Sequence, residues 1–380
     1  MIFVVKRSST ISHTNTLRDL PCLHYLCNVK KAIDIRDLSL EELTAFLVER
    51  GEKPFRAKQV YEWLWTKSVT NFDAMTSLGK DLRTKLSEWF ILNAAVSADE
   101  QISSDRTIKT AFRVENDRVV EGVLIPTTSR MTACISSQVG CSLACKFCAT
   151  GKLKLMKNLQ AGEIYDQVVY LARAAEERYN TPLSNIVFMG MGEPLLNYKN
   201  VLAAIDRITG TPGLGMSPKR ITVSTAGIAK MIKKLGDDDV RFNLALSLHA
   251  ANDAKRSHIM DINDTNNLEV LAEALRYFYD KTGTRITFEY IIFKDFNDSL
   301  NDARELAEFC RNVPCKINII EYNPIDDGEF QQAAVDRVDA FRDYLERCNL
   351  VVNVRRSRGK DIDAACGQLA NKNEAALKGQ

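Results

Sequence analysis

The sequence predicts an α/β fold built around a parallel sheet, and three observations carry this prediction. From about residue 127, strand-like apolar runs alternate with amphipathic helical stretches, which is the rhythm of repeated βα units. There are six such runs, fewer than the eight strands of a closed barrel, so we expect an open, partial (βα)6 barrel, with a doubly wound sheet as the alternative. A chain of 380 residues with 45% apolar side chains can also bury one large core with smaller appendages.

The overall composition excludes several broad classes of protein. The formal net charge of +2 is no sign of a polyanion-binding chain, so a nucleic-acid surface must come from local basic clusters. No apolar run approaches the ~20 residues that span a bilayer, and the initial MIFVV is shorter than the ~7–15-residue core of a signal peptide. We therefore expect a cytoplasmic protein without membrane association. In that compartment ten cysteines indicate metal or redox chemistry rather than structural disulfides.

Residues 1–34 form an extension that we expect to be disordered. The segment KRSSTISHTNTLRDL is basic, rich in hydroxyl side chains and free of acidic residues until Asp19. An organellar transit peptide shares this composition and is the alternative interpretation. Cys22 and Cys27 lie here and receive no role.

Residues 35–95 are predicted to form a helical accessory domain. Apolar residues recur there at spacings of three and four, with a break at Gly51–Pro54. Ser39 is a plausible N-cap, and Glu42 stands where it completes a capping box. The basic residues near Trp63 and Trp65 suggest a contact with RNA, although core tryptophans and solvated charges are the alternative.

Residues 96–126 are predicted to form a β-hairpin linker, because TIKTAFRV and RVVEGVLIP alternate on either side of a turn at Glu115–Asp117. The six strand-like runs of the core follow: MTACISS, NIVFMGMG, RITVSTAG, RFNLALSLHA, RITFEYIIF and KINIIEYNP. Polar signatures end four of these runs: GMGEP (190–194), STAG (224–227), SLHA (247–250) and EYNP (321–324). Since chemistry in βα barrels collects where strands end, we expect these signatures to form one rim around one ligand.

Three cysteines also lie on this rim, at a 1-5-8 spacing in CSLACKFC: Cys141, Cys145 and Cys148. Thiolates are the usual ligands of iron–sulfur clusters. Three of them can hold three irons of one [4Fe–4S] cluster and leave the fourth iron open, as catalytic metal sites do. The alternatives are a zinc site with a distant fourth ligand and three unconnected cysteines.

The CxxxCxxC pattern resembles that of the radical S-adenosylmethionine enzymes, and GMGEP resembles their motif for the methionyl amine. Together, CISSQVGCSLACKFCATG, GMGEPLLN, SLHA and DIDAACGQLA resemble the family that methylates C2 of adenosine in 23S rRNA, at the peptidyl-transferase centre, and in tRNA, 3′ of the anticodon. The resemblance runs from about Ile35 to Ala370. It implies a radical SAM core at residues 127–359 and a C-terminal catalytic tail at residues 360–380. The open iron would then bind the amine and carboxylate of S-adenosylmethionine.

The resemblance also implies the reaction, which uses two molecules of S-adenosylmethionine per turnover. C2 of adenine has no nucleophilic lone pair, so Cys366 in the tail first accepts a methyl group as a thiolate. A 5′-deoxyadenosyl radical from the second molecule removes a hydrogen from that methyl group, and the carbon radical adds to C2. Cys134 would release the product through a transient disulfide with Cys366. Glu121 would be the proton acceptor, although an exposed strand carboxylate is the alternative.

Further positions match the family's ligand-binding residues. Those for S-adenosylmethionine are Gly192, Glu193, Ser224, Ser247, Leu248, His249 and Asn323. The basic stretches 353–361 and 152–157 are candidates for RNA phosphates, and a stacked target adenine would have to be extruded. We expect an electron donor such as flavodoxin or ferredoxin, and a monomer. Cys310, Cys315 and Cys348 are interpreted as packing cysteines.

Two other functions compete with this one. The related family that methylates C8 of the same rRNA adenosine, and confers antibiotic resistance, shares the cysteines and the tail. GMGEP and RGKDIDAACGQLA lie closer to the C2 family. An iron–sulfur redox or RNA-binding protein without methyl transfer is the other alternative, but it would have no need of Cys134 and Cys366.

Overall fold

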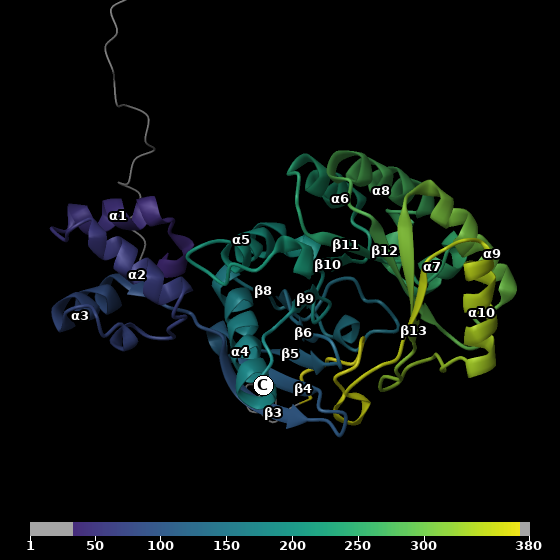
Figure 1. Ribbon diagram of the computed structural model, residues 1–380, viewed down its shortest axis with the longest axis horizontal. Coiled ribbons are helices and arrows are strands. Elements are labelled where there is room, and N and C mark those ends of the chain that lie inside the picture. The colour runs from purple at the N-terminus through teal and green to yellow at the C-terminus, as the bar shows by residue number, and fades with distance from the viewer. Residues whose placement is uncertain (1–32, 373–380) are drawn as a thin grey trace, which may run out of the picture.

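The computed structural model describes residues 33–372 (Figure 1). Nearly all of the predicted extension, with Cys22 and Cys27, lies outside the described residues, as do residues 373–380 of the tail. The centre of the fold is a ten-stranded sheet in the order β14-β13-β12-β11-β10-β9-β6-β5-β4-β3. Its strands are β3 (Val96–Ile102), β4 (Ile108–Arg113), β5 (Val119–Pro126), β6 (Met131–Cys134), β9 (Asn185–Phe188), β10 (Ile221–Thr225), β11 (Asn243–Ser247), β12 (Ile286–Ile292), β13 (Cys315–Glu321) and β14 (Val352–Arg355).

The sheet has a parallel part and an antiparallel part. All strand pairs from β6 to β14 are parallel, whereas β3, β4, β5 and β6 pair antiparallel. Each parallel strand is added beside the one that precedes it, so the order never reverses, as it must in a doubly wound sheet. The doubly wound alternative is therefore wrong. With β3 and β14 as its two edges, the sheet is an open arc.

The six predicted core strands and the predicted hairpin of β4 and β5 are confirmed. Two further strands, β3 and β14, were not predicted. The first is rich in acidic and polar residues and forms an edge. The second overlaps the start of the basic stretch 353–361 that was predicted to contact RNA phosphates, and its Val352 and Val354 pack against the core.

Helices cover the outer face of the parallel strands. They are α4 (Ala161–Tyr179), α5 (Tyr198–Thr209), α6 (Ala229–Asp237), α7 (Asp253–Ile259), α8 (Leu268–Thr282), α9 (Leu300–Phe309) and α10 (Val335–Arg347). The strand β12 shows the two faces: Phe288 and Tyr290 are fully buried, and the Tyr290 ring lies 5.3 Å from that of Phe341 on α10. Alternate residues point the other way, so Thr287 and Glu289 face the inside of the arc.

A helical module stands at one end of the molecule, away from α9 and α10 (Figure 1). It consists of α1 (Leu40–Glu49), α2 (Phe55–Trp65) and α3 (Lys80–Trp89), and strands β1 (Ile33–Asp34) and β2 (Phe90–Ile91) tie its ends together. The predicted capping box is confirmed, with Glu42 N donating to Ser39 Oγ at 3.1 Å and Ser39 N to Glu42 Oε2 at 2.8 Å. No helix within residues 33–372 is both long and apolar enough to cross a bilayer.

The tryptophans of this module divide between its core and its surface. Trp65 is buried, and its ring lies 5.4 Å from that of Tyr165 on α4, so the core alternative holds for this residue. Trp63 is half-buried and lies beneath the Lys67 ammonium, 3.6 Å from its ring centroid. Of the cysteines predicted to pack, Cys310 and Cys315 are buried, but Cys348 is exposed at the C-cap of α10. The packing role predicted for Cys348 is therefore wrong.

Candidate active site

A pocket opens at the carboxyl ends of the parallel strands. It encloses about 870 Å³ of space between atoms, a volume that includes open solvent at its mouth. Most of the predicted site residues line it: Cys141, Cys145, Cys148, Gly192, Glu193, Ser224, Ser247, His249 and Cys366. Cys134, Glu121, Leu248 and Asn323 are buried outside this lining. The structure thus gathers residues that are more than 200 positions apart in the sequence.

The three predicted cluster cysteines lie in the loop between β6 and α4. They are half-buried free thiols that face the pocket. Within residues 33–372, no three histidine, cysteine or acidic side chains converge as ligands of a single ion do. A zinc site requires sulfurs about 2.3 Å from one metal, whereas a [4Fe–4S] cube spreads its ligands over different irons. Three thiols of one loop that face one pocket are a donor set of the kind that iron–sulfur clusters use.

The GMGEP loop presents a carboxylate beside these thiols. Gly192 has a φ of +93°, and a Cβ there would lie 2.4 Å from Gln138 Cβ, so only glycine fits. The Glu193 carboxylate accepts hydrogen bonds from Leu195 N at 3.0 Å and Ala226 N at 2.8 Å. Burial raises its pKa above the usual range for glutamate. A buried carboxylate held in this way can pair with an ammonium group of a ligand.

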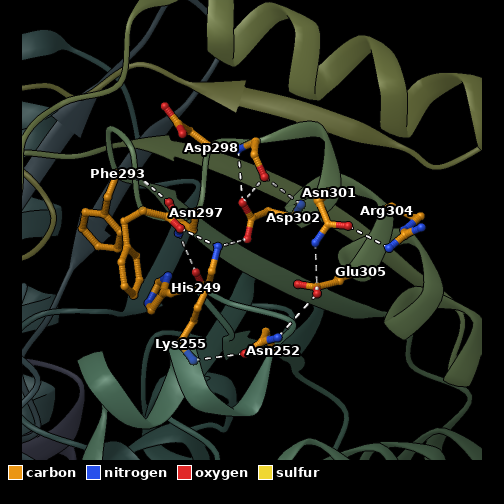
Figure 2. Close-up of polar contacts among 12 residues, drawn as sticks. His249, Asn252, Lys255, Phe293, Asn297, Asp298, Asn301, Asp302, Arg304 and Glu305 are labelled. Atoms are coloured by element: carbon orange, nitrogen blue, oxygen red, sulfur yellow. Dashed lines mark hydrogen bonds and ion pairs between the residues drawn. The ribbon is translucent and has the colours of Figure 1, made fainter.

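His249 lies just after β11, and its backbone adopts a left-handed conformation with a φ of +56°. Its Nδ1 accepts a hydrogen bond from Ile291 N at 3.0 Å, so the ring carries its proton on Nε2. Burial, followed by the charge of Arg256, lowers the pKa of His249 to about 3, and the ring is neutral. Figure 2 shows Asn297 beside this turn, where its Nδ2 donates to His249 O at 2.7 Å. The same Nδ2 also donates to Ile291 O at 2.8 Å.

Two hydroxyls and one backbone segment complete this side of the pocket. Ser224 on β10 and Ser247 on β11 face each other, with their Oγ atoms 3.3 Å apart. The side chain of Leu248 is fully buried in the core, so only its backbone remains to serve a ligand. The hydroxyls suit a ribose, which is the type of ligand group that the sequence predicted here.

The tail brings Cys366 to the pocket through contacts on both sides of this cysteine. Asn323 Nδ2 donates to Cys366 O at 3.2 Å, and Ala149 N, next to the last cluster cysteine, donates to Gly367 O at 2.7 Å. Thr150 Oγ1 donates to Leu369 O at 2.6 Å. Asn323 therefore holds the tail, and its Oδ1 is buried without a hydrogen bond.

Glu121 is fully buried, so the alternative of an exposed strand carboxylate is wrong. Its Oε2 accepts hydrogen bonds from Ala370 N at 3.0 Å and Asn371 N at 3.1 Å, both in the tail. Its Oε1 lies 3.6 Å from the Nζ of Lys109, a buried lysine that our reading of the sequence missed. A lysine inside an otherwise buried strand pattern was the signal that could have identified it.

Cys134 ends β6 on the same face of the sheet as Glu121, since Cys134 pairs with Val123, two residues further along β5. Burial and then the negative charge of Cys366 raise the pKa of Cys134 to about 12, while Arg355 acts in the opposite direction. Cys366 is exposed as a residue, but its thiol lines the pocket, where desolvation raises its pKa against the influence of Arg355. The two cysteines thus interact electrostatically, and one guanidinium favours the thiolate of each.

The basic stretch 353–361 is only partly available for RNA. Arg355 pairs with Glu289 at 3.6 Å, Arg358 lies 3.9 Å from Asp105, and Lys360 lies 3.3 Å from Glu321. Arg356 is exposed. In the second stretch, 152–157, Lys154 is exposed, whereas Lys157 is paired with two glutamates.

A buried arginine behind the cluster loop was also missed. Arg256 on α7 is fully buried and donates to Ala226 O at 2.6 Å and Asn263 Oδ1 at 2.8 Å. Burial lowers its pKa to about 10, and the nearby Cys145 acts against this shift. It places a positive charge behind thiolates that would carry negative charge. Nothing in the sequence around it distinguishes it from the solvated arginines of other helices.

Comparison with known proteins identifies the family. Residues 33–92 match the ribosomal RNA large subunit methyltransferase N-terminal domain, and residues 135–310 match the radical SAM superfamily. A protein of Cytophaga hutchinsonii named probable dual-specificity RNA methyltransferase RlmN is 60% identical over 338 residues, which cover 89% of this chain and 93% of that protein. A protein of Anaeromyxobacter dehalogenans named dual-specificity RNA methyltransferase RlmN is 43% identical over 341 residues, which cover 89% and 91% of the two chains.

A solved structure agrees with these relatives. The crystal structure of a radical SAM methyltransferase from Sphaerobacter thermophilus matches with a TM-score of 0.84 and 39% identity, over 89% of this chain and 99% of that chain. The radical SAM fold that the motifs predicted is therefore confirmed. With its relatives covered almost end to end, the chain belongs to the RlmN family of S-adenosylmethionine-dependent RNA methyltransferases within the radical SAM superfamily.

Proposed function

We propose that this enzyme methylates C2 of adenosine in 23S rRNA, at the peptidyl-transferase centre, and in tRNA, 3′ of the anticodon. The observation that carries the proposal is the position of Cys366. The tail places this thiol in the pocket that also holds the three cysteines of the CxxxCxxC loop, with Cys134 in the adjoining wall. The cysteine that carries the methyl group and the cysteine that resolves its adduct must lie close to each other and to the cluster. A redox carrier needs neither of these two cysteines.

The residues around the pocket fit the groups that the family uses. Cys141, Cys145 and Cys148 would hold a [4Fe–4S] cluster, which supplies the electron that cleaves S-adenosylmethionine when it is bound. Glu193 and the backbone of Gly192 would take the methionyl amine, and Ser224 and Ser247 the ribose. The Nε2–H of His249 and the backbone of Leu248 are left for the adenine. Asn323, which donates to the tail, keeps the carrier beside this ligand.

The chemistry at the cysteines begins with the Cys366 thiolate, which takes a methyl group from S-adenosylmethionine as S-adenosylhomocysteine leaves. A 5′-deoxyadenosyl radical from a second S-adenosylmethionine would take one hydrogen atom from this methyl group, and the resulting carbon radical would bond to C2. The C2 proton would then leave to a base, and the remaining electron would return to the oxidised cluster, which restores the aromatic ring. The Cys134 thiolate then attacks the sulfur of Cys366. The S–C bond breaks, its electron pair stays with carbon, and a proton completes the new methyl group. Two electrons are needed to reduce the resulting disulfide.

The C2 proton has two candidate acceptors on this inner face, Glu121 and Cys134. Glu121 accepts hydrogen bonds from two tail amides, so it is also placed to fix the position of Cys366. Exposed basic residues such as Arg356 and Lys154 would contact RNA phosphates. A small electron carrier such as flavodoxin or ferredoxin would reduce the cluster. We expect the enzyme to act as a monomer in the cytoplasm.

Mass spectrometry of adenosines from rRNA and tRNA tests the proposal in a host with and without this gene product. We expect C2-methyladenosine in both RNAs only when the protein is present. C8-methyladenosine in rRNA would instead support the antibiotic-resistance activity. Unchanged RNA, despite a reconstituted cluster that cleaves S-adenosylmethionine, would exclude both methyl-transfer functions.

A further inference from the structure

Glu289 is a buried carboxylate in the pocket that the reaction above does not use. It lies in the middle of β12, its side chain points to the inside of the sheet, and it is 3% exposed. It lines the same pocket as Ser247 and Cys366. A carboxylate removed from water in this way requires compensation, which makes its partners informative.

The two oxygens of Glu289 differ in their surroundings. Oε1 accepts a hydrogen bond from Asn318 Nδ2 at 2.8 Å. Oε2 receives no hydrogen bond, and its nearest cation is Arg355, whose Nη1 lies at an ion-pair distance of 3.6 Å. Burial raises the pKa of Glu289, while Arg355 and Asn318 favour its ionised form. Arg355 thus lies near Oε2 without a hydrogen bond to it, and Oε2 remains available as an acceptor.

The register of the sheet shows which ligand group Oε2 can reach. Ser247 on β11 is directly paired with Glu289, and Glu289 is paired with Asn318 on β13. Paired residues of neighbouring strands lie about 4.8 Å apart and point to the same face. Ser247 in turn faces Ser224 at 3.3 Å. Glu289 therefore continues the row of hydroxyls that would receive the ribose, three strands from β9, whose following loop carries Glu193.

We propose that Glu289 Oε2 accepts a hydrogen bond from a ribose hydroxyl of S-adenosylmethionine and is a cofactor-positioning residue of this enzyme. The inference rests on the proposed use of S-adenosylmethionine at this site. A carboxylate is the usual acceptor for ribose hydroxyls in nucleotide pockets. The methionyl amine is assigned to Glu193 instead, which follows β9 next to the strand that precedes the cluster loop.

Equilibrium binding to the reconstituted full-length protein tests this assignment, with S-adenosylmethionine and its 2′-deoxy and 3′-deoxy analogues as ligands. The variants are Glu289→Ala and Glu289→Gln, and Thr287→Val is the matched control on the same face of the same strand, outside the pocket lining. We expect Glu289→Ala to weaken S-adenosylmethionine about 10- to 100-fold, the loss typical of a hydrogen bond to a charged group. The Gln variant should lose less, and Thr287→Val should bind within about twofold of wild type.

The deoxy analogues identify the bond itself. One of them should bind weakly to wild type and lose nothing further in Glu289→Ala, since the hydroxyl and its acceptor are then both absent. The assignment would be overturned if Glu289→Ala lost binding affinity equally for all three ligands. It would also be overturned if this variant kept its ~400 nm absorption and bound S-adenosylmethionine with unchanged affinity. Unchanged S-adenosylmethionine binding with weakened RNA binding would assign Glu289 to the target nucleoside and overturn it too. If the wild-type protein bound no S-adenosylmethionine, this result would refute the proposed function itself rather than the role of Glu289.

Discussion

At the scale of single residues, the cysteines of this chain differ by their surroundings rather than by their chemistry. Cys141, Cys145 and Cys148 share one loop and face the pocket, whereas Cys134 is the buried end of a strand. Cys366 reaches the same pocket from a tail that is more than 200 residues away in the sequence. The loop thiols suit metal ligation because they share one loop and face one pocket. Cys134 and Cys366 come from different elements, and negative charge on Cys366 raises the pKa of Cys134.

Replacement of Cys141, Cys145 or Cys148 by Ala tests the cluster assignment. Each variant should lose the ~400 nm iron–sulfur absorption and all 5′-deoxyadenosine production, because two thiolates leave two irons without a protein ligand. Iron analysis and a deoxyadenosine assay of the anaerobically reconstituted protein measure both. Cys348→Ala, which changes an exposed cysteine outside the pocket lining, is the matched control and should keep the cluster. Full iron and full radical yield in any of the three variants would refute the assignment.

Replacement of Cys134 by Ala separates the resolver from the carrier. Without the second thiolate the adduct between Cys366 and RNA cannot be released, so we expect a covalent complex that migrates slowly on a denaturing gel and disappears with nuclease. Cys366→Ala should keep the cluster and bind S-adenosylmethionine but yield neither adduct nor methylated RNA. The Cys134/Cys366 double variant should also show no adduct. Normal turnover by Cys134→Ala would make Cys134 a packing residue only.

At the scale of elements, the tail is the segment on which the proposed reaction depends most. The tail has little regular structure, and side chains of other elements hold it in place instead of strand pairing. Asp361 binds Ser103 Oγ at 2.5 Å and Ser104 N at 3.0 Å, and these bonds lower its pKa to about 2. Because the pKa is lowered on folding, this contact is fully present above pH ~4 and is lost only as the pH falls towards 2. Glu121 holds the other end.

Glu121→Ala should therefore release the end of the tail, because Ala370 N and Asn371 N lose their acceptor. Hydrogen exchange followed by mass spectrometry should show faster exchange of residues 366–372, with other core segments unchanged. Glu121→Gln keeps one acceptor oxygen and should retain most of the protection. If the Gln variant is protected yet inactive, Glu121 has a role in proton transfer as well as in tail docking. Unchanged exchange in the Ala variant would contradict the docking role.

The elements that could be predicted from the sequence were those with a strong local pattern. The alternating βα rhythm identified six parallel strands, and the Ser39 capping box was visible as a spacing of polar residues. The strands β3 and β14 could not be predicted, because the polar residues of one and the arginines of the other conceal short apolar alternations. Whether such a segment forms a strand depends on its pairing with the edge of the sheet rather than on its local propensity.

At the scale of the whole molecule, the site is assembled by the order of the sheet. The thiol loop, the GMGEP turn and the two serines end consecutive parallel strands, so the strand order brings them to one rim. Motifs revealed these residues because their types are unusual at strand ends. Arg256, Lys109 and Glu289 could not be found in this way, since their importance comes from burial next to partners that are distant in sequence.

The helical module is joined to this core by a buried ion pair. Arg36 donates to both oxygens of Asp166 on α4, at 3.0 and 2.9 Å, and their side chains are 4% and 9% exposed. Asp166 also accepts from Ala95 N at 2.9 Å. Burial raises the pKa of Asp166, and Arg36 opposes that shift. The pair therefore links the module, the start of β3 and the core at one point.

Arg36→Ala should lower the free energy of unfolding by about 3–5 kcal/mol, because it leaves the Asp166 carboxylate buried without its cation. The loss should be smaller at pH 5 than at pH 8. Without Arg36 the folded-state pKa of Asp166 rises further above its unfolded value, so proton uptake favours the folded state as the pH falls. Chemical denaturation at both pH values measures the effect.

The controls decide whether this effect belongs to burial or to ion pairing in general. Lys233→Ala breaks a solvent-exposed pair with Glu273 and should cost less than about 1 kcal/mol. Arg36→Met combined with Asp166→Leu should recover much of the stability, since it removes both charges and fills the space with apolar groups. If Arg36→Ala unfolded like wild type at pH 8, packing such as that between Trp65 and Tyr165 would be sufficient to hold the module on the core.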